Sequence, residues 1–182
     1  MPRFARRAWI LAVLALAACG PSTFEGTVRG ITLDVQSSAF TVARDSTGEI
    51  DLMVLYLSDQ PDLCTLMKAG DNVRNSVTLS VWLFQTDADA NNVVPTSGTY
   101  VVRDSSAARH AIPELLQRDA DCLVPVDAAG LTGGAAVDGY RAEAGGSMTG
   151  SFNFSFGPSG EKGKGTINAP FCDANWLFGG CQ

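Results

Sequence analysis

Hydrophobic and polar residues alternate along much of the chain, which is the pattern of half-buried β-strands. The clearest case is residues 151–156, in which Phe152, Phe154 and Phe156 fall on one face and serine and asparagine fall on the other. A Gly-rich stretch follows, and residues 165–171 then alternate in the same way. These two segments predict an antiparallel β-hairpin.

Two further segments, residues 49–59 and 76–85, are more continuously apolar than the others. Such runs suit central strands covered on both sides, or strands of a sandwich core. Shorter segments with partial alternation add further strand candidates at residues 23–42, 98–104 and 139–145.

One short helix is predicted near residues 60–69. Ser58 or Asp59 can cap its start, Pro61 suits the first turn and Gly70 suits the end. Residues 108–124 are ambiguous, because their apolar spacing allows a helix but a proline interrupts it. Many short strands, frequent turns and one helix predict an all-β, mostly antiparallel fold, either a β-sandwich or an open barrel.

The N-terminus has the anatomy of a secretory signal: three arginines, then an apolar run too short to span a bilayer comfortably. The run ends in Leu16, Ala17, Ala18 and Cys19, which resemble the lipobox of bacterial lipoproteins. That resemblance implies cleavage before Cys19, diacylglycerol on its thiol and a further acyl chain such as palmitate on the new amino terminus. It also implies that Gly20 after the cysteine favours the outer membrane over the inner.

The resulting division is a signal peptide at 1–18, a lipidated cysteine and tether at 19–23, and one β-rich domain at 24–182. The domain is similar to small β-rich envelope lipoproteins in an Asp-Leu-Cys helix start at 62–64 and a closing Ala-Pro-Phe-Cys at 169–172. This second similarity implies an envelope location and supplies no activity.

Charge and cysteine usage narrow the class of protein. Without residues 1–18, ten Lys and Arg stand against 19 Asp and Glu, a formal net charge of about −9. Such an acidic chain is a poor partner for nucleic acid. In an oxidising compartment, the four remaining cysteines predict two disulfides. Three pairings are open, and we favour Cys64–Cys172 with Cys122–Cys181.

Candidate chemistry is sparse. Asp87, Asp89 and Asn91 have the alternating oxygen ligands of a calcium loop, although Asn92 and Gly98 replace the glycine and glutamate that an EF-hand requires. A solvated loop is the alternative interpretation. The single histidine lies near serines and an aspartate but outside any known catalytic motif, and the Gly-rich stretch at 157–164 lacks phosphate-loop spacing.

We therefore expect a lipid-anchored envelope protein that acts as a non-enzymatic binding or structural module, without a cofactor. Its partners would be the membrane, through Cys19, and an envelope protein or glycan. Two alternatives remain open: a lipid-anchored hydrolase of envelope or environmental polymers, and a calcium-dependent adhesion module.

Overall fold

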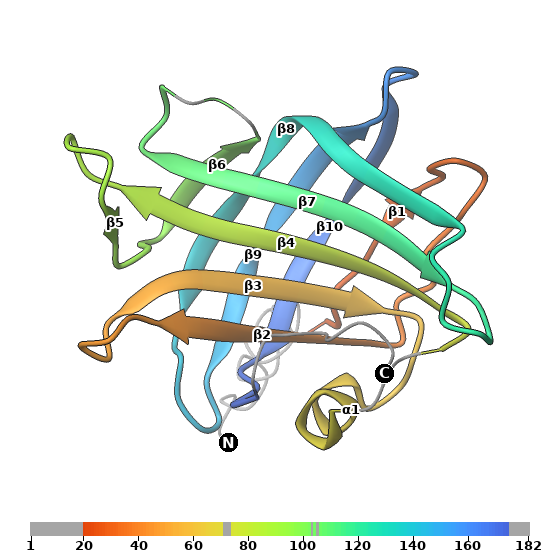
Figure 1. Cartoon of the computed structure of the whole chain (residues 1–182), viewed down its shortest axis with the longest axis horizontal. Coiled ribbons are helices and arrows are strands. Elements are labelled where there is room, and N and C mark those ends of the chain that lie inside the picture. Colours follow the sequence, from red (N-terminus) through yellow and green to blue (C-terminus); the bar gives the residue numbers. More distant parts are fainter. Residues whose placement is uncertain (1–19, 71–73, 103, 105, 175–182) are drawn as a thin grey trace, which may run out of the picture.

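The computed structural model describes residues 20–70, 74–102, 104 and 106–174, and its strands belong to one curled sheet (Figure 1). The strand order is β1-β10-β9-β8-β6-β7-β4-β3-β2, with β5 added to β4. Neighbouring strands are antiparallel except for β6 and β7. The strands are β1 (Glu25–Gly26), β2 (Ser37–Arg44), β3 (Ile50–Ser58), β4 (Ser76–Thr86), β5 (Asn92–Val93), β6 (Gly98–Val102), β7 (Arg109–Arg118), β8 (Val126–Tyr140), β9 (Ser147–Phe156) and β10 (Glu161–Pro170).

The sheet folds over itself into two layers whose strands cross steeply in Figure 1. Strands β2, β3, β4 and β7 form one layer, and β8, β9 and β10 form the other. Strand β8 turns the corner, because residues 126–129 pair with β7 whereas residues 134–137 pair with β6. A register shift between Gly130 and Thr132 lies at this bend. The architecture confirms the predicted all-β fold, an open barrel resembling two packed sheets.

The predicted hairpin of the C-terminal half is confirmed as β9 and β10. Phe152, Phe154 and Phe156 all point into the interior, where their side chains are at most 4% exposed. The ring centroids of Phe152 and Phe154 lie 5.3 Å apart, and those of Phe154 and Phe156 lie 6.3 Å apart. Leucines, valines and two methionines from β3, β4 and β9 complete the core around them.

The ambiguous stretch is extended rather than helical, and forms strand β7. Pro113 lies where the edge of β7 changes partner, after the last residue paired with β6 and before the first paired with β8. A proline has no N–H to give to a ladder, so this position tolerates it. Gly130 of β8 faces it, and a Cβ at that glycine would lie 2.3 Å from Pro113 Cγ.

Two strand expectations are corrected. Residues 31–35 keep the predicted alternation of burial, but they form no strand beyond a single bridge between Val28 and Ile31. The segment 139–145 is the end of β8 followed by the β8–β9 turn. That turn is closed by a hydrogen bond from the Arg141 N–H to the Ser147 carbonyl oxygen (3.0 Å). Its chain reversal requires Gly146, where a Cβ would lie 1.9 Å from the Arg141 oxygen.

Helix α1 (Leu63–Ala69) confirms the helix predicted near 60–69, and Gly70 ends it with a φ of 68°. Its N-cap is Asp62 rather than Ser58 or Asp59, since the Ser58 hydroxyl accepts a hydrogen bond from Gln60 instead. The helix packs on the outer face of β2 and β3. Among the described residues, no helix combines the length and the apolar character needed to cross a membrane.

The predicted disulfide between Cys64 and Cys172 is present and joins α1 to the chain after β10. Cys122 is also disulfide-bonded. Cys181, its predicted partner, and Cys19, the predicted lipidation site, lie outside the described residues.

Candidate functional site

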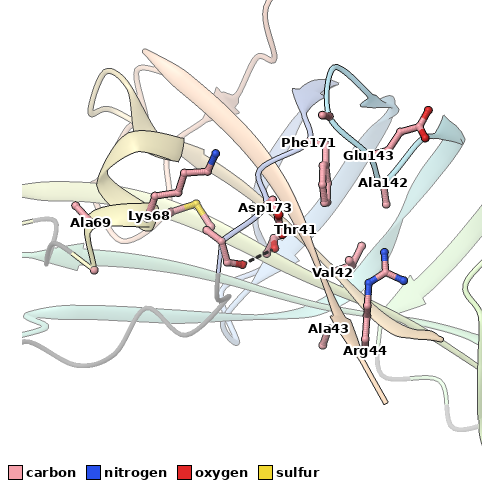
Figure 2. Close-up of a pocket in the computed structure, with 14 residues that line it drawn as sticks. Thr41, Val42, Ala43, Arg44, Lys68, Ala69, Ala142, Glu143, Phe171 and Asp173 are labelled. Atoms are coloured by element: carbon pink, nitrogen blue, oxygen red, sulfur yellow. Dashed lines mark hydrogen bonds between the residues drawn. The ribbon is translucent and has the colours of Figure 1, made fainter. Parts of the chain in front are cut away.

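The two margins of the curled sheet come together where β2 begins and β10 ends, and then separate. The Cys172 N–H donates a hydrogen bond to the Phe40 carbonyl oxygen (2.8 Å), and Phe40 forms a parallel bridge with Phe171. Beyond this contact lies a groove of about 1000 Å³. We define the groove by its walls: β2, the end of α1, the β8–β9 turn and the chain after β10, which contribute residues 41–44, 67–70, 142–144, 171, 173 and 174 (Figure 2).

The walls of the groove are held together by contacts between segments far apart in sequence. The Thr41 hydroxyl donates to the Ala174 carbonyl oxygen (2.9 Å), which fixes the chain after β10 on β2. The Phe171 N–H donates to the Gly146 carbonyl oxygen (2.9 Å) and ties the same segment to the β8–β9 turn. The Cys64–Cys172 disulfide fixes α1 to this segment. The groove is therefore built from a connected framework.

Strand β2 forms one wall of the groove with its backbone edge. It is the last strand of the sheet, and no other described strand pairs with it on the groove side. The Phe40 carbonyl oxygen points to that side, since it accepts from Cys172. Because strand backbone groups alternate in direction, Val42 also directs its N–H and C=O toward the groove. An unpaired strand edge of this kind is a ready hydrogen-bonding surface.

The side chains of the groove combine apolar and charged groups. Val42, Met67 and Phe171 are apolar and at least partly buried. Figure 2 shows Lys68 at the helix side and Arg44 with its guanidinium at the far end. The other lining charges are Glu143, which pairs with Arg141, and Asp173. Polar groups around a concave, partly apolar surface are the usual composition of a ligand site.

The predicted calcium ligands form a hairpin turn between β4 and β5. One Asp87 oxygen, Oδ1, accepts hydrogen bonds from the N–H groups of Asp89 and Asn91, each at 2.9 Å. The hydrogen bond from the Asn91 N–H is the largest cause that lowers the Asp87 pKa. Among the described residues, no group of three His, Cys, Asp or Glu side chains could hold a metal ion. The calcium site stays a prediction, but the turn explains the spacing of these residues.

Two other turns are built in the same way, which the sequence analysis missed. Asp45 and Asp119 each accept hydrogen bonds at Oδ1 from the N–H groups two and four residues later. In all three turns the residue three positions after the aspartate has a left-handed backbone: Gly48, Ala90 and Cys122. Aspartate is favoured in such turns because its carboxylate satisfies backbone donors. The available sequence signal for these turns was therefore an aspartate three residues before the position with the left-handed backbone.

The single histidine sits on the outer face of the sheet. His110 stacks on Phe84 with ring centroids 5.0 Å apart, and its Nε2 lies 3.5 Å from the Thr86 hydroxyl. Ser106 donates its hydroxyl hydrogen to Asp104 (2.6 Å). These contacts explain His110 as part of a sheet face and Ser106 as part of a tight turn.

An acidic pair that the sequence analysis did not single out lies on the hairpin of β7 and β8. The register pairs Leu116 with Asp127, which brings Asp127 beside Glu114 on the same face. Burial raises the pKa of Glu114, and the charge and hydrogen bond of Asp127 raise it further, whereas Arg118 opposes the shift. No sequence signal marks the pair, because the strand register alone creates it.

Glu114→Gln is expected to stabilise the protein at neutral pH and to lose this effect in acid. The folded-state pKa of Glu114 lies above the ordinary value of 4.5. The proton on the Glu114 carboxyl therefore adds its full favourable contribution to the free energy of unfolding below pH 4.5. This contribution is lost as the pH rises through the folded-state pKa. Solvent screening limits the gain to less than about 1 kcal/mol. Urea unfolding at pH 4 and pH 7.5 measures it, with exposed Glu49→Gln as control; an equal gain at both pH values would contradict the assignment.

Comparisons with known proteins assign no function to the chain, so the proposal of a function rests on the geometry described above. No protein-family model, no curated protein and no solved structure matches the chain.

Proposed function

We propose that the chain is a lipid-anchored protein of the cell envelope that binds a ligand in the groove and catalyses no reaction. The observation that carries this proposal is the groove of about 1000 Å³ at the open margin of the sheet. It joins a bare strand edge, apolar side chains and charges of both signs. Such a surface supplies affinity and orientation to a ligand.

The anchoring part of the proposal rests on the N-terminal residues. Leu16, Ala17, Ala18 and Cys19 follow an apolar run and three arginines, as in a lipoprotein precursor. A single acyl chain binds a membrane only marginally, at about 0.8 kcal/mol for each buried CH₂. Two or three chains on Cys19 would make the attachment stable.

Detergent phase separation of cells that express the full chain tests the anchor. We expect the native protein to enter the detergent phase, and Cys19→Ala to remain in the aqueous phase or to keep its signal peptide. Gly20→Ala is the matched control, because a Cβ at Gly20 meets no atom within 4 Å. Processed Cys19→Ala protein in the detergent phase would overturn the proposed anchor.

A further inference from the structure

The first described residues are hydrogen-bonded to the sheet. The Asn168 side chain donates to the Gly20 carbonyl oxygen (2.6 Å), and the Asn168 N–H donates to the Ser22 hydroxyl (2.9 Å). Ser22 is 2% exposed and donates in turn to Ser38 of β2 (2.9 Å). The Thr23 N–H donates to Thr166 (3.1 Å). The segment 20–23 therefore lies fixed between β10 and β2.

The attachment continues into β1. Glu25 pairs with Lys164 in the sheet, and their side chains form a salt bridge of 3.0 Å. Phe24 is buried and stacks on Phe152 with centroids 6.2 Å apart. The segment runs antiparallel to β10, so Gly20 lies toward the C-terminal end of that strand.

We infer that the domain is held directly against the bilayer, with the groove-bearing end of the barrel facing the lipid. The inference rests on the proposed lipidation of Cys19. One peptide bond separates Cys19 from Gly20, so their Cα atoms are about 3.8 Å apart. With Gly20 fixed to β10, no flexible linker separates the acyl chains from the sheet.

The end of the barrel near Gly20 carries the groove. Phe171 lines the groove and follows Asn168 by three residues. In Figure 1 the end of β10, the β8–β9 turn and α1 lie together along the lower side. The β9–β10 turn lies at the opposite, upper side. Strand β9 spans 10 residues between the two turns, a length of about 30 Å.

The surface that would meet the lipid has charges of both signs and few large apolar groups. Arg44, Lys68 and Arg141 are its cations, and Glu143 and Asp173 are its anions. Charges of both signs in nearly equal number fit a zwitterionic headgroup layer. A groove in this position has access to amphiphilic molecules of the bilayer surface.

Fluorophores on two engineered cysteines test the orientation in the full lipidated protein. Ala144→Cys, in the β8–β9 turn, places the label near the proposed membrane side, and Ser159→Cys, in the β9–β10 turn, is the matched control. Both native residues are exposed. The protein is reconstituted in phosphatidylcholine vesicles that contain a nitroxide on the lipid headgroup. We expect at least about twofold stronger quenching at residue 144, because the two turns lie about 30 Å apart along β9 and nitroxide quenching acts over a short range.

A second protein carries 20 Gly and Ser residues between Cys19 and Gly20, a linker with a root-mean-square length of about 25 Å. This insertion is expected to weaken quenching at residue 144 and to remove most of the difference. The intact mass of the protein distinguishes a failure of the proposed anchor from a failure of the proposed orientation. Equal quenching at both positions of acylated protein without the linker would overturn the orientation alone. A mass without acyl chains would overturn the proposed anchor together with the inference.

Discussion

Replacing Cys64 and Cys172 together by alanine is expected to lower the free energy of unfolding by about 2–5 kcal/mol. The disulfide joins residues 108 positions apart. Closing so long a loop restricts the unfolded chain strongly, and loss of the bond restores that freedom. The bond also fixes α1 beside the chain after β10, so its loss loosens two walls of the groove. Equilibrium unfolding in urea under non-reducing conditions measures the change.

Thr65→Ala is the matched control, since Thr65 is an exposed neighbour on the same helix. A surface substitution of this kind changes stability by about 0.5 kcal/mol or less. Indistinguishable unfolding midpoints for the double cysteine variant and this control would contradict the structural role of the disulfide.

Phe154→Ala is expected to destabilise the protein by about 3–5 kcal/mol. The Phe154 side chain is fully buried and lies between the rings of Phe152 and Phe156. Truncation removes a large apolar surface and leaves a cavity that the two layers of the sheet cannot easily close. The same urea titration measures the effect.

Asn153→Ala tests whether the destabilisation expected for Phe154→Ala arises from lost packing in the interior. Asn153 is the preceding residue of β9 and its side chain is exposed on the other face. We expect a change of about 0.5 kcal/mol or less. A loss below about 1 kcal/mol for Phe154→Ala would show that the packing between the two layers is looser than described.

Local patterns were sufficient for several elements of the fold. The alternation of phenylalanines at 152–156 predicted the buried face of β9, and the continuous apolar runs predicted β3 and β4. Gly70 correctly marked the end of α1. In each of these cases the signal lies within a short stretch of sequence and follows from side-chain periodicity.

Strand β8 shows where local patterns fail. It is the longest strand, yet its sequence is rich in glycine and alanine and was not predicted as a strand. Small residues are required there by neighbours distant in sequence: a Cβ at Gly130 would collide with Pro113, and one at Gly133 would lie 2.1 Å from the Asn153 oxygen. Glycine lowers strand propensity but permits this close approach.

The candidate site could not be predicted from the sequence for a similar reason. Its walls come from β2, α1, the β8–β9 turn and the chain after β10, and they meet only when the sheet curls. The predicted Cys64–Cys172 bond gave one contact of this arrangement. Asp87, which the sequence suggested as a calcium ligand, accepts the backbone hydrogen bonds of a turn.

Native mass spectrometry of the protein extracted from its own membranes in mild detergent tests the central claim most directly. We predict cleavage before Cys19, added acyl chains, the loss of four hydrogens for two disulfides, and a non-covalently bound ligand. The ligand should be lost in Arg44→Glu, at the groove, and kept in Arg74→Glu, an exposed arginine outside it. An unacylated mass, or an acylated protein whose bound ligand is absent or unaffected by Arg44→Glu, would contradict the account.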